Sequence, residues 1–147
     1  MKLIGLRNAS TQVVDVDGIV NLGSVYRRYI SDDKCGVTTF TNDSSSITLN
    51  HKGVYHVTAT AIVSAAAAGD VTLTLFANGV ELPGAVATET ITTPTTEFHT
   101  LTIDFYVLVN ATNVLGYFST IPVVLTLVNS GVEATITNVV INATKEV

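Results

Sequence analysis

The chain has 147 residues, of which 47% are hydrophobic and 13% are charged, and its net charge is −5. This length is enough for one domain with a substantial core. The acidic balance argues against a broad basic surface for nucleic acid, and no apolar run approaches the roughly 18 residues that a membrane-spanning helix needs. We therefore expect a soluble protein that neither inserts into membranes nor binds nucleic acid.

The first 35 residues differ from the rest in charge. Five of the seven Lys and Arg residues precede Cys35, whereas the remainder carries two basic and eight acidic side chains. The first ten residues show no clear period, lack the apolar core of a signal peptide, and are predicted to form an arm. The dipeptide Asp17-Gly18 predicts a hairpin between 11–16 and 19–22.

Two adjacent arginines in this segment are a candidate attachment site. Arg27 and Arg28 lie between Tyr26 and Tyr29 and are candidates for attachment to an acidic partner, although a solvated strand edge explains the pair more simply. We assign 1–35 to an N-terminal arm and hairpin that serves oligomerisation or attachment, and 36–147 to the main domain.

The clearest pattern runs from residue 47 to residue 85. Alternate residues between Tyr55 and Val63 are apolar, which is the period of a half-buried strand. The same alternation recurs between Val71 and Leu75, and Asn78-Gly79 follows as a strong hairpin signal.

The rest of the chain continues in short strands. Turns at Pro83-Gly84, 93–95, 110–113 and 129–131 separate expected strands at 86–92, 98–109, 114–118, 123–128 and 134–141. No segment has a helical period. Some eight to ten strands predict an all-β, two-sheet antiparallel sandwich or jelly roll.

A second set of apolar residues occupies the strand faces that point away from this core. A monomer would leave such a set exposed, so we expect a homo-oligomer. The interface candidates are Val54, Ile62, Phe76, Tyr106, Leu108, Val124 and Val128.

The segment 53–59, GVYHVTA, resembles the G-x-Y-x-[FV]-x strand signature of the tumour necrosis factor superfamily and the complement-type globular heads. The strands that follow are similar to the bacterial and phage branch of that group, over about residues 40 to 142. The chain lacks recognisable receptor loops and a carboxylate-rich calcium loop, so neither receptor signalling nor calcium binding is implied.

The whole chain, including GLRN, LGSVYRRY, Cys35-Gly36 and GAVATETITT, is similar to short jelly-roll virion structural proteins encoded in prophages of Gram-positive gut bacteria. This resemblance implies a non-enzymatic homotrimer, with one sheet of each TNF-like jelly roll around a threefold axis. It would be a head decoration, head fibre or tail appendage, assembled in the bacterial cytoplasm and bound to other virion proteins. Host-surface glycans would bind at Tyr117-Phe118 and at 93–97. The alternative is a secreted or surface-displayed bacterial lectin-like module of the same fold.

No residue pattern predicts catalysis or a cofactor. His51, His56 and His99 have no metal-ligand spacing, although three copies of one histidine on a threefold axis would leave a zinc or anion site open. Cys35 lacks a nucleophile signature and is interpreted as a structural thiol. The turn aspartates form no calcium loop, and the remaining carboxylates are scattered singly. We expect no enzyme and no bound metal in the single chain.

Overall fold

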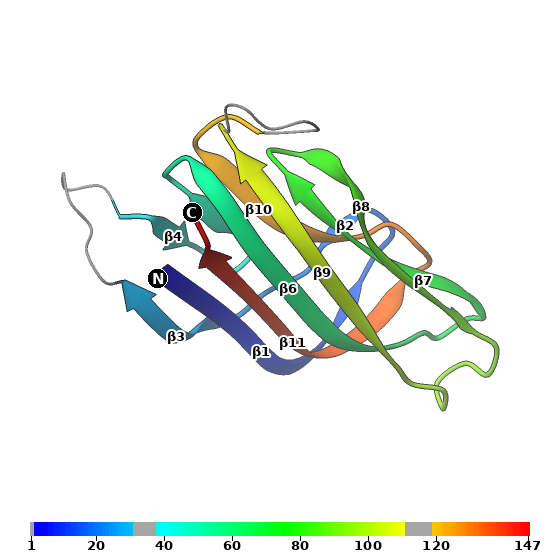
Figure 1. Ribbon diagram of the computed structural model, residues 1–147. Coiled ribbons are helices and arrows are strands. Elements are labelled where there is room, and N and C mark those ends of the chain that lie inside the picture. The colour runs from blue at the N-terminus through cyan, green and yellow to red at the C-terminus, as the bar shows by residue number, and fades with distance from the viewer. Residues whose placement is uncertain (1, 31–37, 111–118) are drawn as a thin grey trace.

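The computed structural model describes residues 2–30, 38–110 and 119–147, whose regular structure is entirely β. Two antiparallel sheets face each other as a sandwich (Figure 1). Sheet A has the order β3-β1-β11-β6-β9, and sheet B has the order β4-β5-β10-β7-β8 with β2 paired to β10. No helix in the described ranges is long and apolar enough to cross a membrane.

The strands have the following bounds. Sheet A contains β1 (Lys2–Val14), β3 (Ser24–Ile30), β6 (Gly53–Ser64), β9 (His99–Val109) and β11 (Ala134–Lys145). Sheet B contains β2 (Gly18–Ile19), β4 (Phe40–Asn42), β5 (Ile47–Leu49), β7 (Gly69–Ala77), β8 (Val80–Ile91) and β10 (Val123–Asn129). The first and last strands pair along their length, so the two termini lie at the same end of the molecule (Figure 1).

The core lies between the sheets, where the alternating pattern of the central strands places it. On β6, the alternate residues from Tyr55 to Val63 are buried, and the intervening residues, including the apolar Ile62, point outward. Phe40 from sheet B packs edge-on against the Tyr55 ring, with 5.8 Å between ring centroids. The predicted two-sheet jelly-roll sandwich is confirmed.

The hairpin at Asn78-Gly79 is also confirmed. Both residues have positive φ, 52° and 76°, and they connect β7 to β8. Asn78 is tolerant of this conformation and Gly79 has no Cβ to resist it, so a local dipeptide specified this turn.

The expected turn at Pro83-Gly84 is a bulge within one strand and does not separate two strands. The strand β8 continues through both residues, but residues 82–85 have no partner in the register with β7, and Gly84 has a φ of 88°. A proline has no N–H to donate, which a strand tolerates at the edge of a sheet, and β8 is an edge strand of sheet B.

The arm predicted for the first ten residues is wrong as well. Lys2–Val14 forms β1, which lies between β3 and β11 in sheet A. Ile4, Leu6 and Val14 are buried in the core, all at even positions, whereas residues 7 and 9–11 between them are exposed. Because the middle of the strand carries polar or small residues on both faces, no alternation of apolar and polar residues was visible in the sequence.

The Asp17-Gly18 dipeptide does make a turn, but it does not make a hairpin. Asp17 has a φ of 63°, and the Gly18 amide donates to the Asp15 carbonyl at 2.9 Å. The preceding strand belongs to sheet A, whereas β2 pairs with β10 of sheet B. The turn therefore carries the chain from one sheet to the other.

These corrections change the domain division. Residues 2–30 share a sheet and a core with the rest of the chain, so a boundary between 35 and 36 does not separate two structural units. The predictions for Cys35, for Tyr117-Phe118 and for a strand at 114–118 concern residues outside the described ranges.

Candidate functional site

The outer face of sheet A is formed by five strands. Pairing of β6 with β9 sets Val54 beside Leu108, His56 beside Tyr106, and Thr60 beside Thr102. Tyr106 is 56% exposed and Ile62 is 36% exposed on this face. Threonines occupy most of the outward positions of β6 and β9 between Ile62 and Tyr106, so few charged side chains lie on this part of the face.

The seven interface candidates do not share one surface. Val54, Ile62, Tyr106 and Leu108 point outward from sheet A, whereas Phe76, Val124 and Val128 lie on the opposite side of the sandwich, on β7 and β10. Val128 is only 6% exposed within the single chain. The sequence could not separate the two groups, because period-2 alternation does not tell which sheet a strand joins.

A polar cluster interrupts the apolar residues of sheet A. The ring of His56 stacks on Tyr106 with 4.8 Å between centroids and 18° between planes. His56 Nε2 also contacts Asp104 Oδ1, on the neighbouring strand. The cluster therefore holds an aromatic surface and a His–carboxylate pair in fixed positions on this face.

Arg27 is held on the outer face of sheet A at the other edge. Its Nε and one Nη donate to Asn142 Oδ1 at 3.2 and 3.1 Å, and its guanidinium lies 5.2 Å from the Tyr26 ring centroid. The Tyr26 hydroxyl donates to the same oxygen at 2.9 Å. A Cβ at Gly5 would lie 2.7 Å from the Tyr26 ring, so this packing requires glycine.

Arg28 has a different role. One Nη donates to the Phe40 carbonyl of sheet B at 2.7 Å, so this side chain links the two sheets. The two arginines thus lie on opposite sides of β3, which pairs only with β1 in the described ranges. The edge-strand interpretation is confirmed, while attachment through Arg27 and Arg28 stays a prediction.

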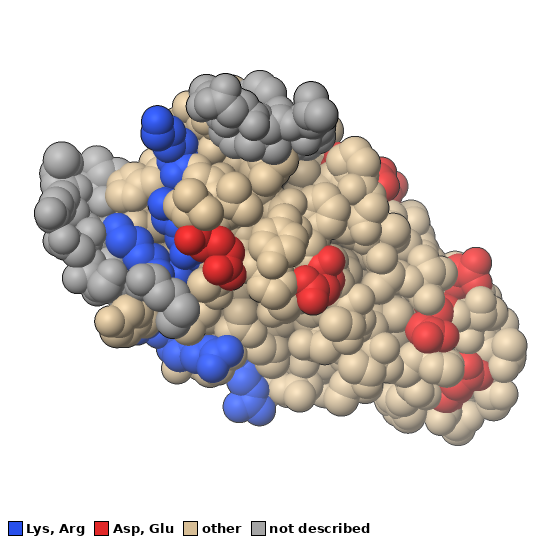
Figure 2. All heavy atoms as spheres, viewed as in Figure 1, with Lys and Arg blue, Asp and Glu red and all other residues tan. Residues whose placement is uncertain are grey.

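The charges are unevenly distributed along the molecule, with the basic residues at one end and acidic residues both beside them and at the other end (Figure 2). The described basic residues gather over β1, β3 and the adjoining ends of β6 and β11, near the chain termini: Lys2, Arg7, Arg27, Arg28, Lys52 and Lys145. Acidic residues dominate the opposite end, where the connections after β1 and before β7, β9 and β11 lie: Asp15, Asp17, Asp70, Glu89, Glu97 and Glu133. The excess of basic residues in the first 35 residues thus corresponds to a basic end of the folded molecule.

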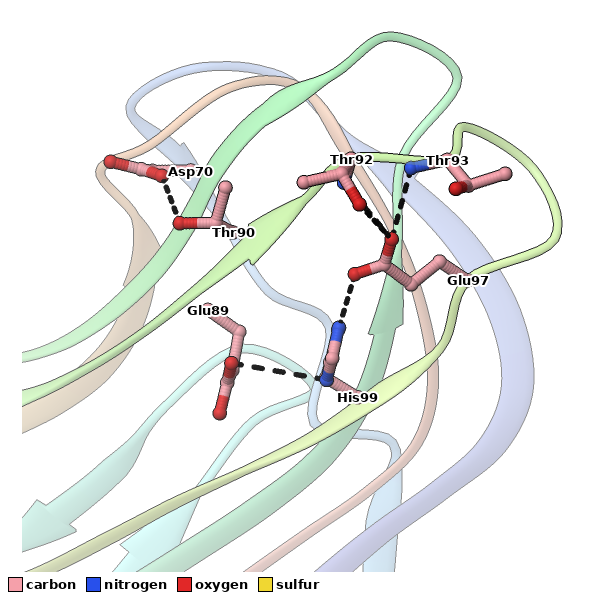
Figure 3. A network of polar contacts seen from close by, with 7 residues as sticks. All are labelled: Asp70, Glu89, Thr90, Thr92, Thr93, Glu97 and His99. Atoms are coloured by element: carbon pink, nitrogen blue, oxygen red, sulfur yellow. Dashed lines mark hydrogen bonds and ion pairs between the residues drawn. The ribbon is translucent and has the colours of Figure 1, made fainter.

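A network of polar side chains lies at the acidic end, where β8 approaches β9 (Figure 3). His99 Nε2 donates to Glu97 Oε2 at 2.5 Å, and its Nδ1 lies 3.8 Å from Glu89 Oε2. Glu97 Oε1 accepts from the Thr92 amide, the Thr92 hydroxyl and the Thr93 amide, at 2.9 to 3.0 Å. One carboxylate therefore joins the turn after β8 to the first residue of β9.

The hydrogen bonds of this network favour the ionised form of Glu97 and the protonated form of His99. The hydrogen bond from His99, with those from Thr93 and Thr92, lowers the pKa of Glu97 to about 2. The bond to Glu97 and the charges of Glu89 and Glu97 raise the pKa of His99 above its usual value, against a smaller opposing effect of burial. Sequence reasoning missed the network, since the approach of Glu89 to His99 depends on how the two sheets meet.

The three histidines do not converge. His51 Nδ1 is 3.1 Å from Thr39 Oγ1, and the other two bind Asp104 and Glu97. Within the described ranges, no group of three or more His, Cys, Asp or Glu residues has a geometry that could hold a metal. Asp43 accepts from the Ser45 amide and the Ser46 hydroxyl, which lowers its pKa, and so acts as a turn-forming aspartate.

Two hollows adjoin these surfaces. One, of about 270 Å³, lies at the edge between the sheets and is lined by Leu82, Pro83 and residues 105–108. The other, of about 160 Å³, lies at the acidic end beside Phe98, which is 61% exposed. Its other lining residues are Ser64, Ala65, Ala66, Thr95 and Thr135.

Neither a protein-family model nor a curated protein sequence matches this chain. Solved structures do match. The globular domain of zebrafish complement 1qA protein matches with a TM-score of 0.64 at 10% identity, covering 100% of this chain and 98% of its own. Eiger TNF from S. frugiperda matches with 0.66 at 11%, covering 100% and 94%.

The PRD1 vertex protein matches with a TM-score of 0.51 at 16% identity, covering 98% of this chain and 96% of its own. At these identities the likeness establishes the fold alone. The chain is therefore a jelly roll of the kind found in TNF and complement globular domains.

Proposed function

We propose that the chain is a non-enzymatic structural protein of a phage or prophage particle, a homotrimeric head decoration, fibre or tail appendage. The observation that supports it most is the outer face of sheet A. Tyr106 and Ile62 are exposed there among threonines, beside the His56–Asp104 pair. Exposed apolar surface of this kind is typical of an interface between protein chains.

Closed threefold assembly requires two different surfaces on each copy, because one patch of one protomer meets another patch of the next. The outer face of sheet A is one such surface. The hollow at the β8–β9 edge, which is lined by Leu82, Pro83 and Phe105, is the second. Tyr106 belongs to both, so the two surfaces adjoin.

The fold of the PRD1 vertex protein supports a place in a particle, where this chain would contact other virion proteins. The end that holds the termini carries the described basic residues and is the side we assign to attachment (Figure 2). Arg27 and Arg28 lie within it. An acidic partner surface would suit this end by charge complementarity.

Binding of a host-surface glycan is assigned to the opposite end. Phe98 presents an exposed ring beside a hollow that Ser64, Thr95 and Thr135 supply with hydroxyl groups. An aromatic face with nearby hydroxyls suits the apolar and polar sides of a sugar. Binding of cell-wall saccharides should be lost in Phe98→Ala. Retention of full binding would contradict a glycan site at this end.

The oligomeric state is tested by light scattering coupled to size exclusion on the full chain. A trimer has three times the protomer mass of 15.5 kDa. Val54→Lys and Val124→Lys are matched variants, since each places a charge at a half-buried valine on the outer face of one sheet. We expect Val54→Lys to yield protomers and Val124→Lys to leave the trimer intact.

A monomeric parent protein would contradict the trimer, and dissociation by Val124→Lys alone would move the interface to sheet B. A chain that begins at Gly36 is unsuitable for this test, because it lacks β1 and β3 of sheet A.

Mass spectrometry of purified phage particles distinguishes the virion role from the lectin-like alternative. Recovery in the particle fraction supports the virion role, and recovery as free or surface-displayed protein supports the lectin-like alternative.

A further inference from the structure

The segment between β8 and β9 is tied together by ionisable groups. It connects the edge strand of sheet B to the edge strand of sheet A, and the Glu97 carboxylate holds it at both ends (Figure 3). Phe98 lies between the two bonded residues, Glu97 and His99. The position of this exposed ring therefore depends on the bond between its neighbours.

The arrangement suits a proton better than a metal ion. Glu97 and Glu89 approach opposite nitrogens of the same imidazole, so their oxygens and one ring lone pair do not converge on a single point. A doubly protonated ring donates to Glu97 from Nε2 and presents a charged N–H toward Glu89, which lies at ion-pair distance from Nδ1. The site is thus complementary to an imidazolium.

We propose that His99 is a pH-dependent latch, whose protonated ring ties the 92–97 turn and β8 to β9, and whose deprotonation loosens this turn and Phe98. A neutral imidazole donates from one nitrogen only and carries no charge, so deprotonation removes the ion pair with Glu89 and leaves the bond to Glu97. The remaining bond is no longer charge-assisted and is weaker. The latch goes beyond the function proposed above and requires neither a trimer nor a glycan.

The groups around His99 are consistent with this assignment. Glu89 faces it from β8 and Glu97 from the turn, while its register partner on β6 is the uncharged Val63. Asp70 of β7 accepts from the Thr90 hydroxyl and points to the outer face of sheet B. No described Lys or Arg lies at this end to compete for the two carboxylates.

The direction of the pH dependence follows from the linkage between protonation and structure. The folded protein raises the pKa of His99 above 6.5. The latch is therefore fully formed below about pH 6.5 and is lost as the pH rises through the raised pKa.

The test uses nuclear magnetic resonance on the isotopically labelled full chain between about pH 5 and about pH 9, a range that spans histidine titration. The His99 ring reports protonation, and exchange of the Thr92 and Thr93 amides, corrected for intrinsic rates, reports the turn. We expect their protection to fall roughly three- to ten-fold across the His99 titration, because the charge-assisted bond is lost. The Asn78 amide, which donates to Val124 at the other end, should not change.

Two variants complete the experiment. His99→Gln should abolish the step in protection, and Glu89→Gln should lower the pH of the step while preserving the bond between His99 and Glu97. The latch is overturned by a pH step that persists in His99→Gln, or by protection that stays constant while His99 titrates. The parent titration decides between these outcomes even if a variant folds poorly.

Discussion

Replacing Leu6 with alanine tests whether the N-terminal segment is part of the fold. Leu6 is fully buried and lies between β3 and β11, opposite Val25 and Ile141. Loss of three carbons removes about 2.4 kcal/mol of transfer free energy at about 0.8 kcal/mol each. The residual cavity adds to this, so we expect a total loss of about 3 kcal/mol in the free energy of unfolding.

The control is Leu3→Ala on the same strand. Leu3 is half-buried and points to the outer face of sheet A, so its loss should be about 1 kcal/mol. With a urea slope of about 2 kcal/mol per molar, Leu6→Ala should lower the unfolding midpoint by about 1.5 M, and Leu3→Ala by about 0.5 M.

The measurement is urea unfolding followed by circular dichroism at one fixed protein concentration, since association would make the midpoint concentration-dependent. An arm that docks only on a partner would leave both midpoints unchanged. If Leu6→Ala lowered the midpoint no more than Leu3→Ala does, the core position of β1 would be refuted.

Three further changes test local features. Tyr55 donates its hydroxyl to the His51 carbonyl at 2.7 Å and burial raises its pKa to about 12, so absorbance titration should show one late tyrosine, which Tyr55→Phe removes at a cost of about 1 kcal/mol. Gly79→Ala, at a φ of 76°, should destabilise the hairpin by about 1 kcal/mol in calorimetry, and an unchanged melting temperature would contradict the turn geometry. The pKa of Glu97 is lowered from 4.5 to about 2, so its stabilisation is present above pH 4.5 and lost as the pH falls toward 2. Glu97→Gln should flatten this part of the acid unfolding curve, and an unaltered curve would argue against the network.

Much of the sandwich could be predicted because its strongest signals are local. The alternation from Tyr55 to Val63 and the Asn78-Gly79 dipeptide each determine their own conformation, through burial of one strand face and tolerance of positive φ. The strands β6, β7, β9 and β10 were accordingly expected within a few residues of their observed bounds.

The errors arose where a partner strand overrides the local pattern. Strand β1 has a polar middle without apolar alternation, and its pairing with β11 and β3 holds it in sheet A. Pro83 lies in a bulge of β8 that has no partner on β7, and the strand continues past it because an edge strand can leave that position without a donor. In both places the hydrogen bonds to a neighbour distant in sequence decide the structure.

The candidate site divides in the same way. The sequence by itself determined that a second apolar set exists, that charge is uneven, and that the fold is all-β, since these follow from composition and period. Only the tertiary structure decided that Val54 and Tyr106 share sheet A while Phe76 and Val124 do not. Likewise, only the approach of β8 to β9 brings Glu89 to His99. Such contacts depend on which strands become neighbours, and that is a property of the whole packed chain.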